Sequence, residues 1–240
     1  MIKWCRHAAA KGRGHRFVGV YTPLAPLSAL TPLPPLPPLC GQANDGGVMH
    51  GRNLDWNIPE NLKDFVIDVD VFSGGEHVYS ATGAVGFVGF LNGMRVKGEK
   101  WTVSQDARNH GGRIPVNIMQ ALATHCLTPE QAIRKVLESD LGASGFSGAV
   151  TALSDIPIVD DVYYVMSGEG ASDAAVVTRD RNAAKDVWRL GTDAANEPNQ
   201  KPIIPSDNFW LTETNYDHWE PVPKADNRRD PANELMAALG

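Results

Sequence analysis

Two short polar segments of the sequence hold the residue types that could do chemistry. The segment 50–55 places Arg52 and Asp55 three residues apart, at the end of an expected strand. The segment 213–219, Glu-Thr-Asn-Tyr-Asp-His-Trp, contains Asn215. Cys40 lies a short way upstream of Arg52, and a thiol is a common nucleophile in covalent catalysis. We predict that the two segments meet in one active-site pocket.

Each of these residues also has a simpler structural interpretation. Arg52 and Asp55 could form an ion pair that only holds the strand end. Asn215 could stabilise the turn that follows a strand, as asparagine often does. The cluster Asp226-Asn227-Arg228-Arg229 could be a solvated group of surface charges. On spacing alone, both interpretations remain open.

The cysteines and histidines do not form a disulfide framework or a metal site by their spacing. The chain has three cysteines, Cys5, Cys40 and Cys126, and an odd, sparse set of this kind indicates free or buried thiols. No His-x-x-x-His or Cys-x-x-Cys spacing occurs. Glycine-rich phosphate-binding motifs are absent, and Gly145–Gly148 is expected to lie in a loop rather than in a nucleophile elbow. We therefore expect no metal and no cofactor.

Length and composition predict a globular domain with a substantial core. The chain has 240 residues, 42% of them hydrophobic and 21% charged, with a net charge of −6. The acidic balance, without a basic stripe, argues against nucleic acid as a partner. No apolar run approaches the roughly 20 residues that span a bilayer. The N-terminus is interrupted by basic residues and makes a poor secretory signal.

The order of the predicted elements favours an α+β domain. Residues 1–39 end in a Pro/Leu-rich run and are predicted to be disordered, or to be a proline-rich docking ligand. Residues 40–240 are predicted to form the folded domain. Within it we expect strands, then helices, then strands. The expected strands are 65–71, 78–82, 84–91, 101–104, 162–166, 174–178, 187–190 and 210–214. The expected helices are 114–124, one that begins at Thr128-Pro129, and one from Asp230 to the end.

Several motifs together resemble the acid ceramidase and N-acylethanolamine acid amidase family of N-terminal-nucleophile hydrolases. The matching segments are His-Gly-Arg-Asn-Leu-Asp (50–55), Gly-Phe-Val-Gly (86–89), Thr-Val-Ser (102–104), Asp-Val-Tyr-Tyr (161–164), Val-Thr-Arg-Asp-Arg (177–181), Glu-Thr-Asn-Tyr-Asp-His-Trp (213–219) and Asp-Asn-Arg-Arg (226–229). The resemblance covers about residues 46–240. Of the two branches of the family, Asp-Val-Tyr-Tyr (161–164) and Glu-Thr-Asn-Tyr-Asp-His-Trp (213–219) are closer to the amidase.

The resemblance implies a fold, a reaction and a set of site residues. It implies an αββα sandwich, a proenzyme that cleaves itself, and a cysteine at the new N-terminus whose α-amine takes the thiol proton. Cys40 would be that nucleophile, Arg52 and Asp55 would orient it, Asn215 would donate to the oxyanion and Arg228 would support the pocket. The substrate would be an N-acyl amide lipid, with peripheral contact to lipid surfaces and a lysosomal location.

The sequence also departs from the family pattern at three places. Cys40 is too close to Arg52, and Gly41–Asn44 does not read as a strand, although an evenly shortened hairpin would still present the cysteine. The family's glutamate is replaced by Ala107, and the neighbouring Asp106 is expected on the opposite face of its strand. The sandwich is expected to be incomplete at both ends. The alternative function is therefore a catalytically inactive member or fragment that binds acyl lipids without turnover.

Overall fold

The computed structural model describes most of the region that the sequence predicts to be folded. It describes residues 39–42, 47–53, 64–108, 114–124, 126–190 and 209–238. The predicted Pro/Leu-rich segment lies outside the described residues except for Leu39, and so does Asp55.

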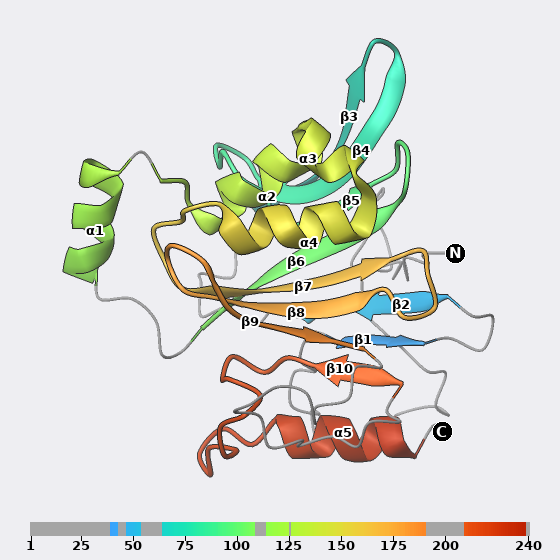
Figure 1. The fold of residues 1–240 in the computed structure, drawn as a ribbon, viewed down its shortest axis with the longest axis vertical. Coiled ribbons are helices and arrows are strands. Elements are labelled where there is room, and N and C mark those ends of the chain that lie inside the picture. Colours follow the sequence, from blue (N-terminus) through green and yellow to red (C-terminus); the bar gives the residue numbers. More distant parts are fainter. Residues whose placement is uncertain are drawn as a thin grey trace.

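A seven-stranded antiparallel sheet forms the largest element of the fold (Figure 1). Its strands follow one another in chain order, so each strand pairs with the next one along the sequence. They are β3 (Val66–Ser73), β4 (Glu76–Ala84), β5 (Asn92–Arg95), β6 (Trp101–Ala107), β7 (Val162–Gly168), β8 (Ala174–Arg179) and β9 (Ala184–Arg189). The sequence predicted most of these strands from their β-branched and aromatic residues.

Both faces of the sheet are covered at β7 and β8. Every residue of these two strands is buried. Along β7, Tyr164 and Met166 belong to one apolar cluster, whereas Tyr163 and Val165 belong to a second one. Because successive side chains of a strand point to opposite faces, the two clusters lie on opposite sides of the sheet. A continuous apolar run is expected for a strand that is covered on both faces.

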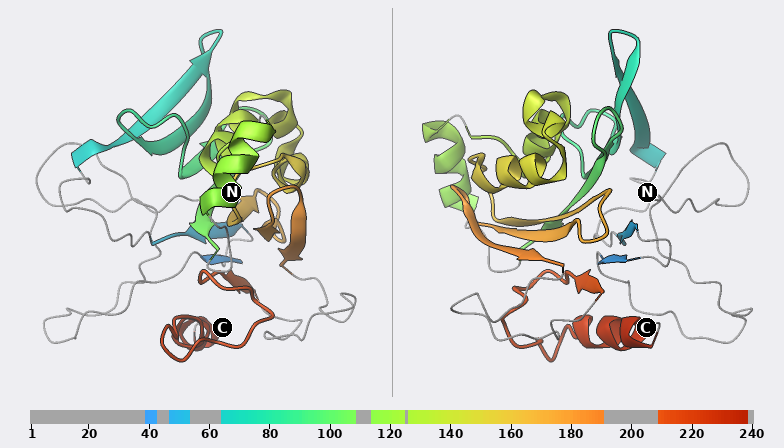
Figure 2. Two further views of the ribbon diagram at one scale, coloured as in Figure 1. Left: turned by 90° about the vertical axis from the view of Figure 1, so that its left-hand side faces the viewer. Right: turned by 45° about the vertical axis from the view of Figure 1, so that its right-hand side comes forward.

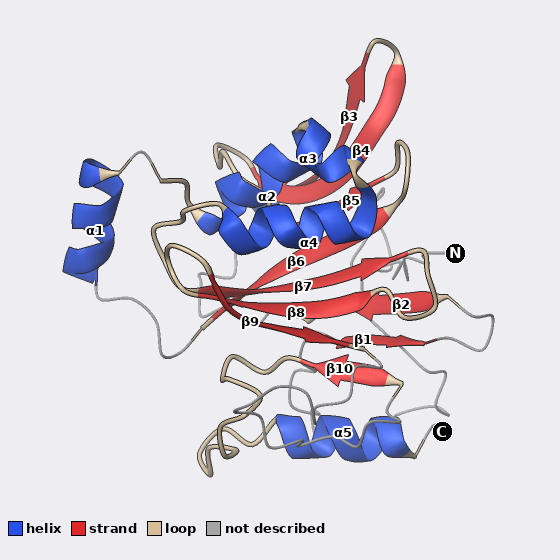
Figure 3. Ribbon diagram, in the orientation of Figure 1, coloured by secondary structure: helices blue, strands red, loops and turns tan. Residues whose placement is uncertain are grey.

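The first cluster lies under the helices. Helices α2 (Pro129–Glu138) and α4 (Gly145–Asp155) contact the central strands of the sheet, with the short α3 (Asp140–Ala143) between them (Figure 3). The Thr128 hydroxyl accepts a hydrogen bond from the Gln131 amide, and the Gln131 side chain accepts one from the Thr128 amide. This capping box confirms the helix start that the sequence predicted.

A three-stranded antiparallel sheet covers the second cluster. Its order is β10 (Trp210–Thr212), β1 (Leu39–Gln42), β2 (Val48–Gly51), and its strands contact β7 and β8. The prediction that the run after Cys40 is not a strand is therefore wrong. Pairing on both sides, with β2 and with β10, compensates for the weak strand propensity of Gly41 and Gln42. Helix α5 (Arg229–Ala237) contacts β10.

Two elements extend away from these layers. The β3–β4 hairpin projects beyond helices α2 and α3 in all three views (Figures 1 and 2). Helix α1 (Ile114–Ala123) lies to one side of the other helices in Figure 1, and it confirms the predicted helix 114–124. Its Asn117 side chain accepts hydrogen bonds from the Arg181 guanidinium, which follows β8.

Two further predictions about local structure are wrong. Residues 84–91 were expected to form a strand. Only Ala84 does so, as the last residue of β4, and the residues after it form turns and bends before β5. Residues 145–148, expected to be a loop, form the first turn of α4. The small residues suggested a loop, but Phe146, Ala149 and Val150 lie at helical spacing and are buried against the sheet. The fold class itself, α+β with antiparallel sheets, is confirmed.

Candidate active site

Arg52 lies directly after β2 and is tied to the large sheet. Its Nη1 atom donates to the side-chain oxygen of Asn92 at 2.5 Å and to the carbonyl of Leu91 at 3.4 Å. Asn92 is the first residue of β5. Arg52 therefore connects the end of β2 in the small sheet to the start of β5, an inner strand of the large one. Its predicted partner Asp55 lies outside the described residues, so the predicted ion pair stays a prediction.

Asn215 lies three residues after β10 and has all of its N–H groups engaged. Its backbone adopts a left-handed conformation with φ 66°, which asparagine tolerates better than most residues. The backbone amide donates to Oε1 of Glu213 at 2.7 Å. The side-chain Nδ2 donates to Oδ1 of Asp106 and to the carbonyl of Ala107, both at 2.8 Å. The predicted donation to an oxyanion would therefore require the release of one of these bonds.

Asp106 is the residue on which several of the predicted site residues act. Asp106 is partly buried, and this burial raises the pKa of its carboxyl group above the ordinary value. The charge of Arg52, the hydrogen bonds from Asn215 and from the Ala107 amide, and the charge of Arg228 oppose this rise. Asp106 was expected on the face of β6 opposite to Ala107. The Asp106 side chain accepts the hydrogen bond from Asn215, so that face of β6 is the one that meets Asn215.

Arg228 lies at the start of α5 and faces the loop that contains Asn215. Its Nη2 atom donates to the Thr214 carbonyl at 3.3 Å and to a carboxylate oxygen of Asp226 at 2.7 Å. The interpretation of this pair as exposed surface charge does not hold for the arginine, because its side chain is only 16% exposed. Asn215 is hydrogen-bonded to Asp106, and the charges of Arg52 and Arg228 act on the same carboxyl group, while the shared active-site pocket stays a prediction.

Cys40 lies in a different environment from these residues. It pairs with His50 on β2 and with Leu211 on β10. Its side chain is 0% exposed and belongs to the apolar cluster between the two sheets. The thiol donates a weak hydrogen bond to the Met166 carbonyl at 3.6 Å, and burial raises its pKa well above the ordinary value. A thiol in such surroundings is a neutral core group.

The register of the small sheet explains the separation between Cys40 and the polar group. Leu39, the residue before Cys40, pairs with Gly51 and with Thr212. Arg52 and Glu213 are the next residues after these two partners, and Asn215 follows shortly after. The polar group therefore lies past the N-terminal end of β1 as the structure describes it, whereas Cys40 lies inside the strand.

Two further arginines, which the sequence analysis did not select, hold the loop 214–220. Arg229 is 2% exposed, and its guanidinium donates to the carbonyls of Tyr216, Asp217, His218 and Glu220. Arg108 forms a buried double hydrogen bond with Asp217, with both N···O distances at 2.7 Å. The Tyr163 hydroxyl also donates to Asp217 at 2.6 Å, and Lys185 Nζ lies 3.6 Å from its Oδ2. The pKa of Asp217 is lowered because these partners outweigh burial. Arg229 lies within the matching motif 226–229 and Arg108 in none of the matching motifs, and nothing in their spacing identifies their partners.

His50 lies beside Cys40 in a buried polar network between the sheets. Its Nδ1 contacts the Thr102 hydroxyl at 2.8 Å, and its Nε2 contacts the Ser104 hydroxyl at 2.9 Å. Burial, with a smaller effect from the charge of Arg52, lowers its pKa to about 3. The ring is therefore neutral over most of the acidic range and acts as a hydrogen-bonding group.

The described residues show neither a metal cluster nor a membrane-spanning helix. Among them, no group of three or more His, Cys, Asp or Glu side chains is arranged to hold a metal ion. In the same part of the chain, every helix is too short or too polar to cross a bilayer.

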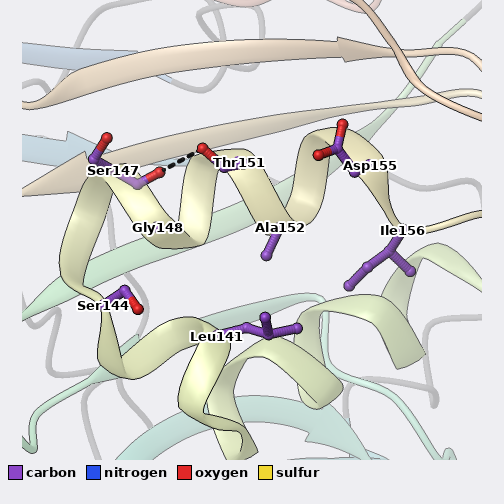
Figure 4. Close-up of a pocket in the computed structure, with 8 residues that line it drawn as sticks. All are labelled: Leu141, Ser144, Ser147, Gly148, Thr151, Ala152, Asp155 and Ile156. Carbon is purple, nitrogen blue, oxygen red and sulfur yellow. Dashed lines mark hydrogen bonds between the residues drawn. The ribbon is translucent and has the colours of Figure 1, made fainter.

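An open hollow of about 600 Å³ lies between α3 and α4, far along the chain from the predicted site residues (Figure 4). Small and hydroxyl-bearing side chains make up most of its lining, with Leu141 and Ile156 on the apolar side. The Thr151 hydroxyl, which lies in it, donates to the Ser147 carbonyl of its own helix. None of the predicted site residues lines this hollow.

Comparison with known proteins finds related amidases and ceramidases. The chain is 36% identical over 200 residues to the N-acylethanolamine-hydrolyzing acid amidase of Rattus norvegicus. The aligned region covers 83% of this chain and 50% of that protein. It is 26% identical over 206 residues to the acid ceramidase of Balaenoptera acutorostrata scammoni, and this aligned region covers 80% of this chain and 48% of that protein. The chain thus spans about half the length of the curated relatives it matches. No protein-family model matches it.

A solved structure supports the same relationship. The fold is similar to that of a Caenorhabditis elegans N-acylethanolamine-hydrolyzing acid amidase ortholog, with a TM-score of 0.66 and 27% sequence identity. The match covers 85% of this chain and 79% of that chain.

Proposed function

Since the chain belongs to the N-acylethanolamine acid amidase and acid ceramidase family, we propose that it hydrolyses the amide bond of N-acyl lipids. The substrates would be N-acylethanolamines or related lipids, and the products a fatty acid and an amine. The observation that supports this most directly is the hydrogen bond from Asn215 to Asp106, a carboxyl group on which the charges of Arg52 and Arg228 also act. Cationic donors next to polar acceptors suit the carbonyl and N–H of an amide.

The proposal includes the αββα arrangement implied by the family. Contacts place α2 and α4 against the seven-stranded sheet, the small sheet against β7 and β8, and α5 against β10. We propose that these are the four layers of the sandwich, formed by one domain over residues 40–240. Residues 1–39 would then form a separate segment.

Catalysis in this proposal uses Cys40 as the nucleophile. Cleavage between Leu39 and Cys40 would give Cys40 a free α-amine, which can accept the thiol proton. The thiolate would attack the amide carbonyl, the amine would leave with a proton, and water would then release the fatty acid. Arg52, Arg228 and Asp55 would orient the reacting groups. Because the thiol lies in the apolar cluster, cleavage must also free the end of β1 so that the thiol can reach the polar group.

A second candidate function is favoured by the surroundings of Cys40. A fully buried thiol with a raised pKa is not activated, and Ala107 offers no carboxylate. We therefore propose as the alternative that the chain binds acyl lipids without turnover.

The two candidates differ in a direct test at acidic pH. The chain is incubated, its intact mass is measured, and hydrolysis of a fluorogenic acyl amide is followed. Hydrolase function predicts a product that begins at Cys40, and hydrolysis that is lost in Cys40→Ala but retained in the matched control Cys126→Ala. A full-length chain without hydrolysis contradicts it. Lipid binding that is unaffected by Cys40→Ala would then support the second candidate.

Acid-dependent activity and lysosomal location remain predictions from the family. The names of the relatives describe acid-working enzymes, and we propose the same for this chain. A pH profile of the fluorogenic assay tests the first point. Microscopy of the tagged chain with a lysosomal marker tests the second.

A further inference from the structure

The side chain of Glu213 holds the turn that carries Asn215. Its Oε1 atom accepts hydrogen bonds from the backbone amides of Thr214 and Asn215, both at 2.7 Å. Asn215 has a φ of 66°, in the left-handed region that is less favourable than ordinary backbone conformations even for asparagine. The two hydrogen bonds compensate for this cost. Glu213 therefore fixes the backbone from which the Asn215 side chain projects.

This carboxyl group is buried without an ion-pair partner. Glu213 is 1% exposed, and both of its described hydrogen bonds come from neutral backbone amides. Among the ion pairs between described residues, none includes Glu213. A buried carboxylate of this kind is unfavourable, because it has lost its hydration and no paired cation replaces it. The neutral, protonated form is therefore favoured at this position.

The charged groups that face Glu213 come from three other elements. The carboxyl group of Asp106 on β6 and the hydroxyl of Tyr163 on β7 lie on the acidic side, and the guanidinium of Arg229 in α5 opposes them. Burial, followed by the charge of Asp106, raises the pKa of Glu213 well above its ordinary value. The amide hydrogen bonds and the charge of Arg229 oppose this rise without cancelling it.

Proton binding by Glu213 removes the buried charge and keeps the turn. A protonated carboxyl group retains an oxygen that accepts the two amide hydrogen bonds. Loss of the proton creates a second negative charge beside Asp106, whose own charge is opposed by Arg52 and Arg228. A group whose pKa is raised in the folded chain contributes stability in acid, and this stability is lost as the pH rises through the folded pKa. The turn at Asn215 is therefore most stable in acid.

We propose that protonated Glu213 is the positioning residue that holds Asn215 for the reaction, so that acid stabilises this part of the site and neutral pH loosens it. The inference rests on the proposed function and on the predicted donation from Asn215 to the oxyanion. It gives the expected acid dependence a physical origin in one buried side chain. Because the oxyanion forms only after attack on the carbonyl, loosening of Asn215 should lower kcat and leave KM nearly unchanged.

Hydrogen exchange of the full chain tests the turn directly. Mass spectrometry follows a peptide that contains the Thr214 and Asn215 amides, and the exchange rates are corrected for the intrinsic effect of pH. In the unmodified protein, protection should fall about tenfold from about pH 5 to about pH 8, because proton release adds a buried charge to the closed turn. Glu213→Gln keeps an oxygen for the same two hydrogen bonds and should retain its protection over this range.

Two further variants separate the charge of Glu213 from its hydrogen bonds. Glu213→Leu removes the acceptor, so both amides should lose protection at acidic and at neutral pH. Glu220→Gln changes an exposed carboxylate of the same loop and should show the pH dependence of the unmodified protein. Asp217 and His218 are present in every variant, so their titration produces no difference between variants. If Glu213→Leu does not fold, as judged by circular dichroism, Glu213→Gln and Glu220→Gln still give opposite expectations.

Hydrolysis of a fluorogenic acyl amide over the same range connects the turn with the reaction. At neutral pH, Glu213→Gln should retain about tenfold more of its acid kcat than the unmodified protein does, with KM unchanged. Protection that follows these expectations without any hydrolysis supports the role of Glu213 at the turn and contradicts the hydrolase function. Hydrolysis with the same pH profile in Glu213→Gln as in the unmodified protein supports the hydrolase function and overturns the inference. Loss of protection in Glu213→Gln at acidic pH, or protection in the unmodified protein that does not change with pH, also overturns it.

Discussion

The interior of β1 and the region past its first described residue differ sharply in environment. Cys40, inside the strand, is surrounded by apolar side chains and has no contact with water. Past Leu39 and its partners Gly51 and Thr212, the chain reaches Arg52 on one side and the loop with Asn215, which donates to Asp106, on the other. The difference shows that residue type alone does not define a nucleophile. A thiol needs nearby positive charge and access to water to ionise, and the apolar cluster provides neither.

The first prediction concerns the buried pair of Arg108 and Asp217, which holds the loop 214–220. Arg108→Met leaves Asp217 buried without its double hydrogen bond, so the free energy of unfolding should fall by about 3–5 kcal/mol. Urea denaturation followed by circular dichroism measures it. The control is Arg134→Met, which breaks an exposed pair with Glu138 on one helix and should change stability by less than about 1 kcal/mol. Equal losses in the two variants would show that the Arg108–Asp217 pair is not special.

The part of the fold that could be predicted is the part encoded by neighbouring residues. The start of α2 follows from Thr128-Pro129 and Gln131, and β7 follows from its continuous apolar run. The strand at Cys40 and the helix at Gly145 were missed for the same reason. Their local sequences are weak, and contacts with distant strands determine their structure.

The candidate site shows the same division. Arg52, Asn215 and Arg228 could be selected because they lie in recognisable motifs. The partnership of Asp106 with Asn215 joins residues 109 positions apart, and no spacing rule links them. The burial of Cys40 depends on which face of β1 meets β7, and that requires the register of three paired strands. Residue types were predictable here, whereas their environments were not.

The second prediction concerns the acid stability of the buried region next to Cys40. The folded pKa of His50 is about 3, below its ordinary 6.5. Between these values the unfolded chain binds a proton and the folded chain does not, so stability falls as the pH falls. From about pH 6.5 to about pH 4.5 this amounts to about 2–3 kcal/mol. His50→Gln should remove that part of the slope in urea denaturation over a pH series.

The polar region should respond to acid with the opposite sign. Burial raises the pKa of Glu213 and of Asp106, so the folded chain binds their protons first and gains stability as the pH falls. The comparison between His50→Gln and the unmodified protein isolates the histidine from this opposing effect. The control His77→Gln changes a partly exposed ring and should leave the slope in place. A slope that is the same in His50→Gln as in the unmodified protein would contradict the assignment.

The last and smallest prediction asks whether Cys40 behaves as a core residue or as a reactive one. Cys40→Ala removes one buried heavy atom from the cluster and should lower stability by about 1 kcal/mol, whereas Cys126→Ala, at a partly exposed site, should lower it less. Removal of a strained catalytic group is instead often neutral or stabilising. In a variant that retains only Cys40, a thiol reagent should react at the rate of unfolding. Rapid labelling of the folded chain, together with unchanged stability of Cys40→Ala, would contradict the assignment of Cys40 to the apolar cluster and would indicate a reactive thiol.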